Sequence, residues 1–471
     1  MRTVNVDVAI IGAGTAGLAA FRAAKKAGKS ALLVEAGAYG TTCARVGCMP
    51  SKLLIAAAES AHHARVAAPF GVHTTVEVDG RAVMDRVRRE RDRFVGFVLA
   101  SIETLAPEER LLGRARFVSP TELSVTTVAG DVRVTMRSAV IATGSVPYIP
   151  AMFERVRDRL VVNDDVFGWS DLPASLAVFG AGVIGLELGQ AFQRLGVRVR
   201  VFGRGNTVGP LADPVVKQRA AEIFHEELDV DFDAHVTSVE PDGAGVVVAW
   251  TEADGRKRTE SFAAALIAAG RRANLMGIAL ENAGIVASSK VDRRTLQYGK
   301  TNIFSAGDAT DDIPLLHEAA DEGEIAGANA ARFPAVTAGA RRSGLGIAFS
   351  DPAIAVVGGG YAAAAQKPYV VGEVDFGDQG RSRILLQNRG LARLYADPAT
   401  RRFLGAEMIG PRVEHLAHLL AWAHQAEMTV DTMLAMPFYH PVIEEGLRTA
   451  LRALASALSA DGFRGGEKAT T

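Results

Sequence analysis

The stretch Asp7-Val8-Ala9-Ile10-Ile11-Gly12-Ala13-Gly14-Thr15-Ala16-Gly17 decides the fold of this 471-residue chain, because it occurs twice. The second copy, Leu176-Ala177-Val178-Phe179-Gly180-Ala181-Gly182-Val183-Ile184-Gly185, lies 168 residues further along. Each copy is an apolar strand, a G-x-G-x-x-G turn and a helical run, and a β-rich segment follows at 31–35 and at 197–202. The sequence therefore predicts a βαβ unit that is used twice.

The glycines of such a turn have separate roles in binding a dinucleotide. The first makes the turn, the second lets the backbone approach a pyrophosphate, and the third lets the helix pack closely on the strand. We predict these roles for Gly12, Gly14 and Gly17 in the first copy and for Gly180, Gly182 and Gly185 in the second. Glu35 follows Gly17 by 18 residues, which is close to the spacing of a carboxylate that bonds a ribose hydroxyl.

The composition describes a globular chain with an ample core. It is 48% apolar and 22% charged, and the net charge is −1. At about 150 residues per domain, the length predicts three domains. The balanced charge gives no reason to expect nucleic acid or an acidic membrane as a partner. No uncharged apolar stretch reaches the ~18 residues that a membrane span needs, so we expect a soluble, cytoplasmic protein.

The chain has only two cysteines, Cys43 and Cys48, and they follow the first fingerprint. In a regular helix, Cα atoms five residues apart are separated by roughly 8.6 Å, whereas a disulfide usually needs less than ~7 Å. The segment must therefore be irregular, and Gly47 and Pro50 permit a distorted helix start. A pair so close in sequence predicts a disulfide that is made and broken during turnover, and the alternative is two buried free cysteines.

Two fingerprints with a cysteine pair after the first resemble the flavin-dependent pyridine nucleotide–disulfide oxidoreductases, most closely the dihydrolipoamide dehydrogenase branch. That branch carries Gly-Gly-Thr-Cys-x-x-x-Gly-Cys-x-Pro-Ser-Lys, which residues 40–52 match, with Thr41 in place of a glycine and Ala44-Arg45 in place of Leu-Asn. The resemblance implies an α/β fold with two Rossmann-like dinucleotide-binding domains, for FAD and NAD(P), and a C-terminal α+β dimerisation domain.

The resemblance also divides the chain. We predict an FAD-binding domain from residues 1–146 and 272–342, an NAD(P)-binding domain at 147–271, a dimerisation domain at 343–460, and a disordered polar tail at 461–471.

The family match assigns roles around the cysteines. Cys48 is expected to face the isoalloxazine, Cys43 to exchange with substrate, and Lys52 and Glu187 to form a buried ion pair near the flavin. Asp308, Leu315 and His317 are expected at the flavin, and the predicted cofactor-binding residues also include Thr42, Thr143, Gly144 and Gly270, of which Gly144 and Gly270 each end a short buried strand.

The second half of the chemistry is predicted at Tyr439-His440-Pro441-Val442-Ile443-Glu444-Glu445. Dithiol chemistry needs a base, because the thiolate is the nucleophile, and histidine suits that role near neutral pH. The family takes its base from a His-Pro with a glutamate five residues after the histidine, which His440 and Glu445 match. The family usually has Thr and Ser where Val442 and Glu444 stand. There the histidine serves the partner subunit's disulfide, so the resemblance implies an obligate homodimer.

The repeat also permits a comparison of the two nucleotide sites. A shift of Glu35 by 168 residues gives Gly203, which Arg204 follows. The second unit lacks the carboxylate that bonds an unmodified 2′-hydroxyl and has an arginine where a 2′-phosphate could be met. We expect NAD(P), with a lean to NADP(H); the alternative is a solvent-facing Arg204.

The sequence therefore favours an FAD-dependent oxidoreductase that passes electrons between a dihydrolipoamide-type dithiol and NAD(P). An NADPH-dependent disulfide reductase of the glutathione reductase type is the nearest alternative. A non-catalytic scaffold subunit of a 2-oxoacid dehydrogenase complex is an alternative of another class, and such a complex is also a candidate partner of the enzyme.

Overall fold

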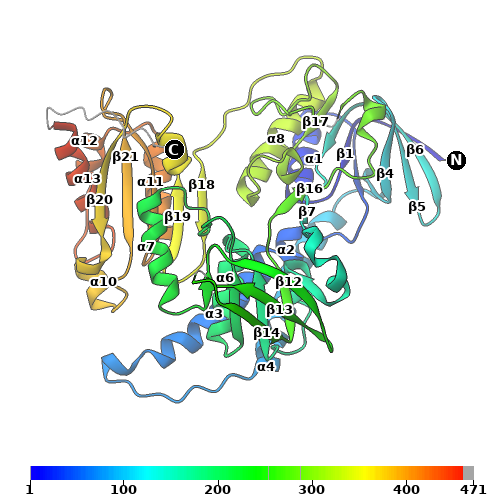
Figure 1. Ribbon diagram of the computed structural model, residues 1–471. Coiled ribbons are helices and arrows are strands. Elements are labelled where there is room, and N and C mark those ends of the chain that lie inside the picture. The colour runs from blue at the N-terminus through cyan, green and yellow to red at the C-terminus, as the bar shows by residue number, and fades with distance from the viewer. Residues whose placement is uncertain (1, 253, 287, 460–471) are drawn as a thin grey trace.

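The computed structural model describes residues 2–252, 254–286 and 288–459, and the predicted disordered tail lies outside these ranges. The described strands form one seven-stranded sheet, two five-stranded sheets and two smaller sheets, with helices packed between them (Figure 1). This is the mixed α/β architecture predicted from the repeat. No helix of the described part of the chain is long and apolar enough to cross a bilayer.

The first βαβ unit builds the seven-stranded sheet, in the order β3-β2-β1-β6-β5-β4 with β17 beside β6. The bounds are β1 Arg2–Ile11, α1 Thr15–Lys26, β2 Ala31–Glu35, β3 Arg110–Leu112, β4 Arg114–Ser119, β5 Glu122–Thr127, β6 Gly130–Ile141 and β17 Ile303–Ser305. Helix α8 (Leu316–Arg332) lies against α1, and a Cβ at Gly323 would overlap the Ala16 carbonyl oxygen. The two helices therefore approach as closely as glycine permits.

The second βαβ unit reproduces the first, residue for residue. Its all-parallel sheet runs β11-β10-β9-β15-β8, with bounds β8 Leu160–Val162, β9 Ser175–Phe179, α6 Val183–Arg194, β10 Arg198–Phe202, β11 Val230–Asp231 and β15 Ala264–Ile267. Val8 pairs with Ala31 in the first unit and Leu176 with Val199 in the second, so both partners are displaced by the predicted 168 residues. Helices α1 and α6 begin and end with the same offset.

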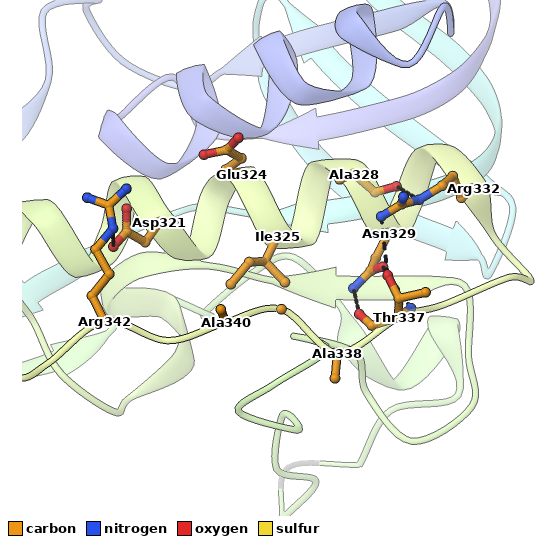
Figure 2. Close-up of a pocket in the computed structure, with 11 residues that line it drawn as sticks. Asp321, Glu324, Ile325, Ala328, Asn329, Arg332, Thr337, Ala338, Ala340 and Arg342 are labelled. Carbon is orange, nitrogen blue, oxygen red and sulfur yellow. Dashed lines mark hydrogen bonds and ion pairs between the residues drawn. The ribbon is translucent and has the colours of Figure 1, made fainter. Parts of the chain in front are cut away.

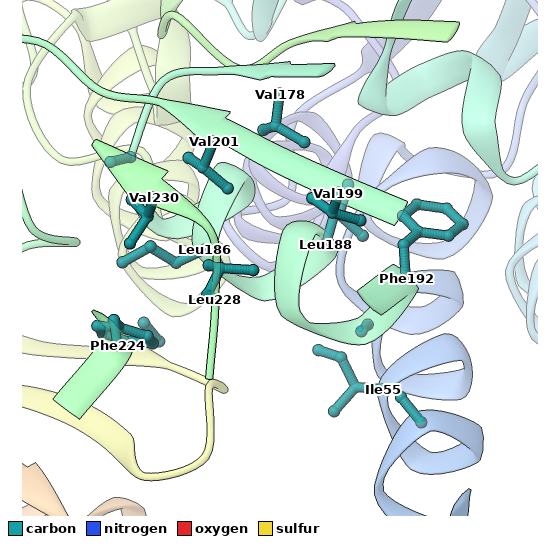
Figure 3. Packing of buried hydrophobic residues seen from close by; sticks show 14 of the residues in the cluster. Ile55, Val178, Leu186, Leu188, Phe192, Val199, Val201, Phe224, Leu228 and Val230 are labelled. Atoms are coloured by element: carbon teal, nitrogen blue, oxygen red, sulfur yellow. The ribbon is translucent and has the colours of Figure 1, made fainter. Parts of the chain in front are cut away.

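The core of the second unit fixes the helix that carries Cys48. Figure 3 shows Leu186, Leu188 and Phe192 of α6 beside the valines of β9 and β10, with Ile55 of α3 (Cys48–Arg65) on the other side. Full burial of one such side chain stabilises the fold by about 1.5–3 kcal/mol. Helix α3 is therefore held against helix α6, although the two are far apart in sequence.

The C-terminal unit is an antiparallel sheet covered by helices (Figure 1). The sheet order is β18-β19-β22-β21-β20, with bounds β18 Leu345–Ala348, β19 Ala353–Val357, β20 Val370–Asp375, β21 Leu391–Ala396 and β22 Phe403–Gly410. Helices α11 (Val413–Gln425) and α13 (Glu445–Ser459) pack on it. In α13, Leu447, Leu451 and Leu454 form a buried stripe at helical spacing, which explains why this segment folds as a helix.

Candidate redox site

The two cysteines lie on either side of a break between two helices. Helix α2 (Thr42–Val46) carries Cys43, and α3 begins at Cys48. Gly47 has φ −125° and ψ −119°, and a Cβ there would come within 3.2 Å of the Cys43 Cα. The predicted break in the helix is therefore present, and it lies at a glycine whose backbone approaches that of Thr42 and Cys43 closely. Both thiols are free in this structure.

The two thiols differ in acidity because the Cys43 thiol donates a hydrogen bond to the Cys48 sulfur. A hydrogen bond from the Cys43 thiol lowers the pKa of Cys48 to about 6, against a desolvation effect that raises it, and Lys52 adds a further lowering. The same hydrogen bond, with burial, raises the pKa of Cys43 far above its usual range. In the dithiol state, these contacts favour the thiolate form of Cys48 over that of Cys43.

The predicted ion pair is formed. Lys52 Nζ of α3 lies 2.7 Å from Glu187 Oε2 of α6. The Glu187 side chain is only 5% exposed, and its other oxygen accepts a hydrogen bond from the Phe349 backbone N–H at 2.8 Å. A buried carboxylate needs such compensation, and here both oxygens have partners.

The first nucleotide cradle has the predicted geometry. A Cβ at Gly12 or Gly17 would overlap a backbone oxygen, whereas a Cβ at Gly14 would meet nothing within 4 Å. Glu35 points into the same turn, because its Oε2 accepts from the Ala13 N–H at 2.8 Å. Glycine is thus required by packing at the two outer positions, and the open space lies over the middle one, where a pyrophosphate would approach.

A second group of predicted residues lines the neighbouring strand ends. Asp308 follows β17, and its Oδ2 accepts a hydrogen bond from the Ser145 hydroxyl at 2.6 Å. Thr143 Oγ1 is buried without a hydrogen-bond partner in the described chain, and Gly144 has a positive φ of 70°. An orphaned hydroxyl between these groups is the kind of atom that a bound cofactor satisfies. The residues present therefore fit FAD.

Two predicted residues lie apart from these contacts. Leu315 is the N-cap of α8, and His317 is exposed in the first turn of that helix. Leu315 has an apolar side chain, and the His317 side chain forms no hydrogen bond within the described chain. Their assignment to the flavin stays a prediction.

The second cradle repeats the first. A Cβ at Gly180 or Gly185 would overlap backbone oxygens, and a Cβ at Gly182 would again meet nothing within 4 Å. Gly270 follows β15 and has φ 106°, a conformation that favours glycine. This unit therefore has the shape of a second dinucleotide site.

The end of β10 differs from the end of β2. Arg204 is exposed and its side chain forms no ion pair within the described chain, so its guanidinium is free to meet an anion. Gly203 is buried, and a Cβ there would come within 2.7 Å of the Phe232 Cα and 2.8 Å of the Phe232 carbonyl oxygen. A glutamate cannot be placed at 203 without moving the backbone of that neighbour.

The predicted base, His440, and its orienting acid, Glu445, are in contact near the C-terminal end of the described chain. His440 Nδ1 lies 3.0 Å from both carboxylate oxygens of Glu445, and the His440 side chain is 80% exposed. The bond to His440 lowers the pKa of Glu445. No hydrogen bond or ion pair joins His440 to either cysteine within the described part of this single chain.

Sequence reasoning missed several groups around the redox segment. Asn163 Nδ2 donates to the Val46 carbonyl of α2 at 3.1 Å, and Arg271 in turn donates to Asn163 Oδ1 at 3.0 Å and to Ser145. Phe349 was missed as well. These residues belong to no local motif, so only their position in space marks them.

The hollow drawn in Figure 2 is separate from this site. It has a volume of about 350 Å³ and lies between the outer face of α8 and the segment 337–342. Part of its polar lining is already engaged: Asn329 bonds the Thr337 backbone, and Arg342 pairs with Asp321 at 3.2 Å. None of the predicted site residues lines it.

Comparison with known proteins agrees with the geometry. The family model described as pyridine nucleotide-disulphide oxidoreductase matches residues 6–323, and the model of the dimerisation domain of the same family matches 346–451. The chain is 30% identical to a dihydrolipoyl dehydrogenase from Haloferax volcanii, over 96% of this chain and 97% of that one. It is equally 30% identical to a mercuric reductase from Streptomyces lividans, over 97% and 96%.

Solved structures share the fold. LpdA from Mycobacterium tuberculosis superposes with a TM-score of 0.81 at 24% identity, covering 96% of this chain and 99% of that one. A copper(II) complex of the HOCl-induced flavoprotein disulfide reductase RclA from Escherichia coli gives 0.79 at 22% identity, covering 95% and 99%. At these identities the likeness establishes the architecture.

Proposed function

Because the chain belongs to the pyridine nucleotide-disulphide oxidoreductase family, we propose that it transfers electrons between a dihydrolipoamide-type dithiol and NAD(P) through Cys43, Cys48 and FAD. Relatives named dihydrolipoyl dehydrogenase, aligned along nearly the whole chain, support the choice of dithiol. FAD and a pyridine nucleotide are typical of the family.

One observation carries the proposal. Two cysteines meet across the Gly47 break, and the Lys52–Glu187 pair stands one helical turn beyond Cys48. A structural cysteine pair needs no cation beside it, whereas a thiolate that leaves and returns in each turnover is stabilised by one.

The residues divide the thiol chemistry as follows. His440 of the partner subunit takes a proton from the first substrate thiol, and the resulting thiolate attacks Sγ of Cys43 in the oxidised enzyme. The Cys43–Cys48 bond breaks, and Cys48 leaves as the thiolate that its environment favours. The second substrate sulfur loses its proton and attacks the first, so the substrate disulfide forms and Cys43 leaves with the proton from His440.

The substrate is thereby oxidised by two electrons and the enzyme disulfide is reduced to a thiol and a thiolate, with one proton released. Bound FAD would supply the route by which these two electrons reach a nicotinamide as hydride. Glu445 would hold the His440 ring in the tautomer that accepts the proton, as an orienting carboxylate does.

The remaining assignments belong to the same proposal. The dimerisation domain places the chain among proteins that pair through this region, and a homodimer would bring the exposed His440 to the partner's cysteines. We keep the predicted domain boundaries at residues 146, 271 and 342, a cytoplasmic location, and association with a 2-oxoacid dehydrogenase complex as proposals. Arg204 favours NADP(H) as the nicotinamide.

An NADPH-dependent disulfide reductase is the second candidate, and the exposed Arg204 is the observation that favours it. Steady-state assays of NAD(H) and NADP(H), each with lipoamide and glutathione couples, separate the two. We expect the lipoamide couple to be turned over much faster than the glutathione couple. Turnover of glutathione disulfide alone would replace the dehydrogenase proposal with the reductase, and turnover of neither would favour the scaffold role.

A further inference from the structure

Phe349 contacts both members of the Lys52–Glu187 pair. Its backbone N–H donates to Glu187 Oε1 at 2.8 Å, and its ring centre lies 4.6 Å from Lys52 Nζ. A cation over the face of an aromatic ring within about 6 Å is attracted by the ring quadrupole. A single residue of the C-terminal unit therefore binds the carboxylate by its backbone and the ammonium by its ring.

Phe349 lies on a short segment, residues 349–352, that joins β18 to β19 and that we term the α6 strap. The strap is fastened along one face of α6. Gln190, one turn after Glu187, accepts from the Asp351 N–H and donates to the Asp351 carbonyl, both at 2.8 Å. Arg194, one turn further, pairs with the Asp351 carboxylate at 2.9 Å.

Glu227 in turn fixes the two α6 side chains that bind the strap. The Arg194 side chain is only 3% exposed, and Glu227 bonds it from the other side at 2.8 Å. Gln190 is also buried and also bonds Glu227. Buried polar groups with all partners in place hold one arrangement, because breaking any contact leaves an unsatisfied group. These contacts therefore hold the α6 strap in one position on α6, and in that position the Phe349 ring lies over Lys52.

We propose that Phe349 is a positioning residue for Lys52, held over the ammonium by the contacts of Gln190 and Arg194 with Asp351. The inference rests on the proposed function, in which Lys52 stabilises the Cys48 thiolate. A lysine on a four-carbon stem has many rotamers, and the ring removes those that carry the charge away from Cys48. The C-terminal unit thus contributes to the redox site of its own chain, besides any contribution to a partner.

The test measures the reactivity of each thiol with iodoacetamide in the holoenzyme reduced by dithiothreitol, between pH 5 and 8. Mass spectrometry of peptides separates Cys48 from Cys43. The charged or titratable groups placed around Cys48 are Cys43 of α2, Lys52 of α3 and Glu187 of α6. Phe349→Leu should slow Cys48 alkylation at pH 6.5 by roughly two- to five-fold and move its midpoint upward. Phe349→Tyr, which keeps the aromatic face, should restore the wild-type profile.

A matched pair on α6 tests the strap. Gln190→Ala should change the profile in the same direction as Phe349→Leu, because it removes two of the hydrogen bonds that hold Asp351 on α6. Gln193→Ala, on the same helix, removes a bond to the Glu227 carbonyl but no contact to the strap, so it should leave the profile unchanged.

Lys52→Met separates this inference from the function on which it rests. If Lys52→Met raises the Cys48 midpoint but Phe349→Leu and Gln190→Ala leave it at the wild-type value, the positioning role is wrong and the proposed function stands. If Lys52→Met also leaves it unchanged, Lys52 does not act on Cys48, and both the inference and that part of the proposed function are overturned.

Discussion

Glu35 and Gly203 occupy the same position in the two βαβ units, 168 residues apart, and they have opposite consequences. The Glu35 carboxylate accepts a hydrogen bond from the Ala13 N–H at 2.8 Å, inside the first glycine turn. Gly203 has no side chain and no room for one, because Phe232 lies against it. The two units have the same strand register, but only the first carries a carboxylate at this position.

Arg204 gives the first prediction. If it bonds a 2′-phosphate, Arg204→Ala removes a charge-assisted contact of about 1.5–3 kcal/mol. At ~1.4 kcal/mol per tenfold, the Michaelis constant for NADP(H) should rise roughly 10- to 100-fold, with that for NAD(H) nearly unchanged. A wild-type enzyme that strongly prefers NAD(H), with Arg204→Ala silent towards both, would leave Arg204 as a solvated loop residue.

Introducing an acid at 203 is not a useful way to favour NAD(H), although the repeat by itself suggests it. The overlap of any Cβ at 203 with Phe232 predicts that Gly203→Glu destabilises the fold. A fall in melting temperature should therefore accompany any change in cofactor preference.

The fingerprint glycines give a prediction with an internal control. Gly180→Ala would drive a methyl group into the Ala268 carbonyl oxygen, whereas Gly182→Ala would place it in open space. Gly180→Ala should lower the melting temperature clearly. Gly182→Ala should fold normally but bind NAD(P)H weakly, because its methyl occupies the approach of the pyrophosphate. Equal nucleotide affinity in Gly182→Ala and wild type would contradict this site.

Thr143 predicts opposite effects on the apo and holo proteins. Its buried hydroxyl has no partner in the described chain, and an unsatisfied buried group costs about 1–3 kcal/mol. Thr143→Val should therefore leave apoprotein stability equal or higher while weakening FAD binding, measured by thermal unfolding and by flavin fluorescence titration. Purified wild-type protein should be yellow, with about one FAD per chain. A folded, colourless protein that takes up no FAD would refute the cofactor assignment.

The cysteines should show distinct pH profiles. Only the thiolate reacts with iodoacetamide, so the rate of Cys48 alkylation should rise through a midpoint near pH 6 and level off above pH 7. In His440→Gln, which lacks the base proposed to act on Cys43, that cysteine, whose pKa is raised, should stay unreactive over this range. In Cys43→Ala the largest cause of the lowering is lost, so the Cys48 midpoint should move upward. A Cys43 that reacts faster than Cys48 in His440→Gln would mean that the two roles are exchanged.

His440 should be required for dithiol turnover only. His440→Gln removes a positioned base, whose usual contribution is ~10²–10⁴ in rate. Oxidation of NAD(P)H by an artificial one-electron acceptor, which needs no thiol exchange, should be retained as the control. Glu445→Gln should give a smaller loss, because the ring keeps its base but loses its orienting carboxylate.

Mixed dimers test whether the base acts across the subunit interface. A Cys43→Ser chain paired with a His440→Gln chain retains one intact composite site if His440 serves the partner. Such mixtures should recover dithiol activity that neither parent shows. Inactive mixtures with confirmed subunit exchange would place the base and the cysteines in one chain.

The amino-acid sequence alone determined the features that follow from local spacing. The strand–turn–helix of each unit, the position of every fingerprint glycine and the break between Cys43 and Cys48 were predictable, because each depends on residues a few positions apart. His440 and Glu445 are also close in sequence, but their pairing was predicted from the family resemblance. The predicted Lys52–Glu187 pair required the family resemblance, since 135 residues separate its members.

Tertiary structure alone decided what surrounds these motifs. The contact of Phe349 with Lys52, and the exclusion of any side chain at Gly203 by Phe232, join segments that no periodicity links. Both depend on how helices and strands pack on one another, which sums many weak contacts over the whole core. Local spacing therefore specifies which groups can do chemistry, whereas packing specifies which neighbours orient them and which substitutions the site has room to accept.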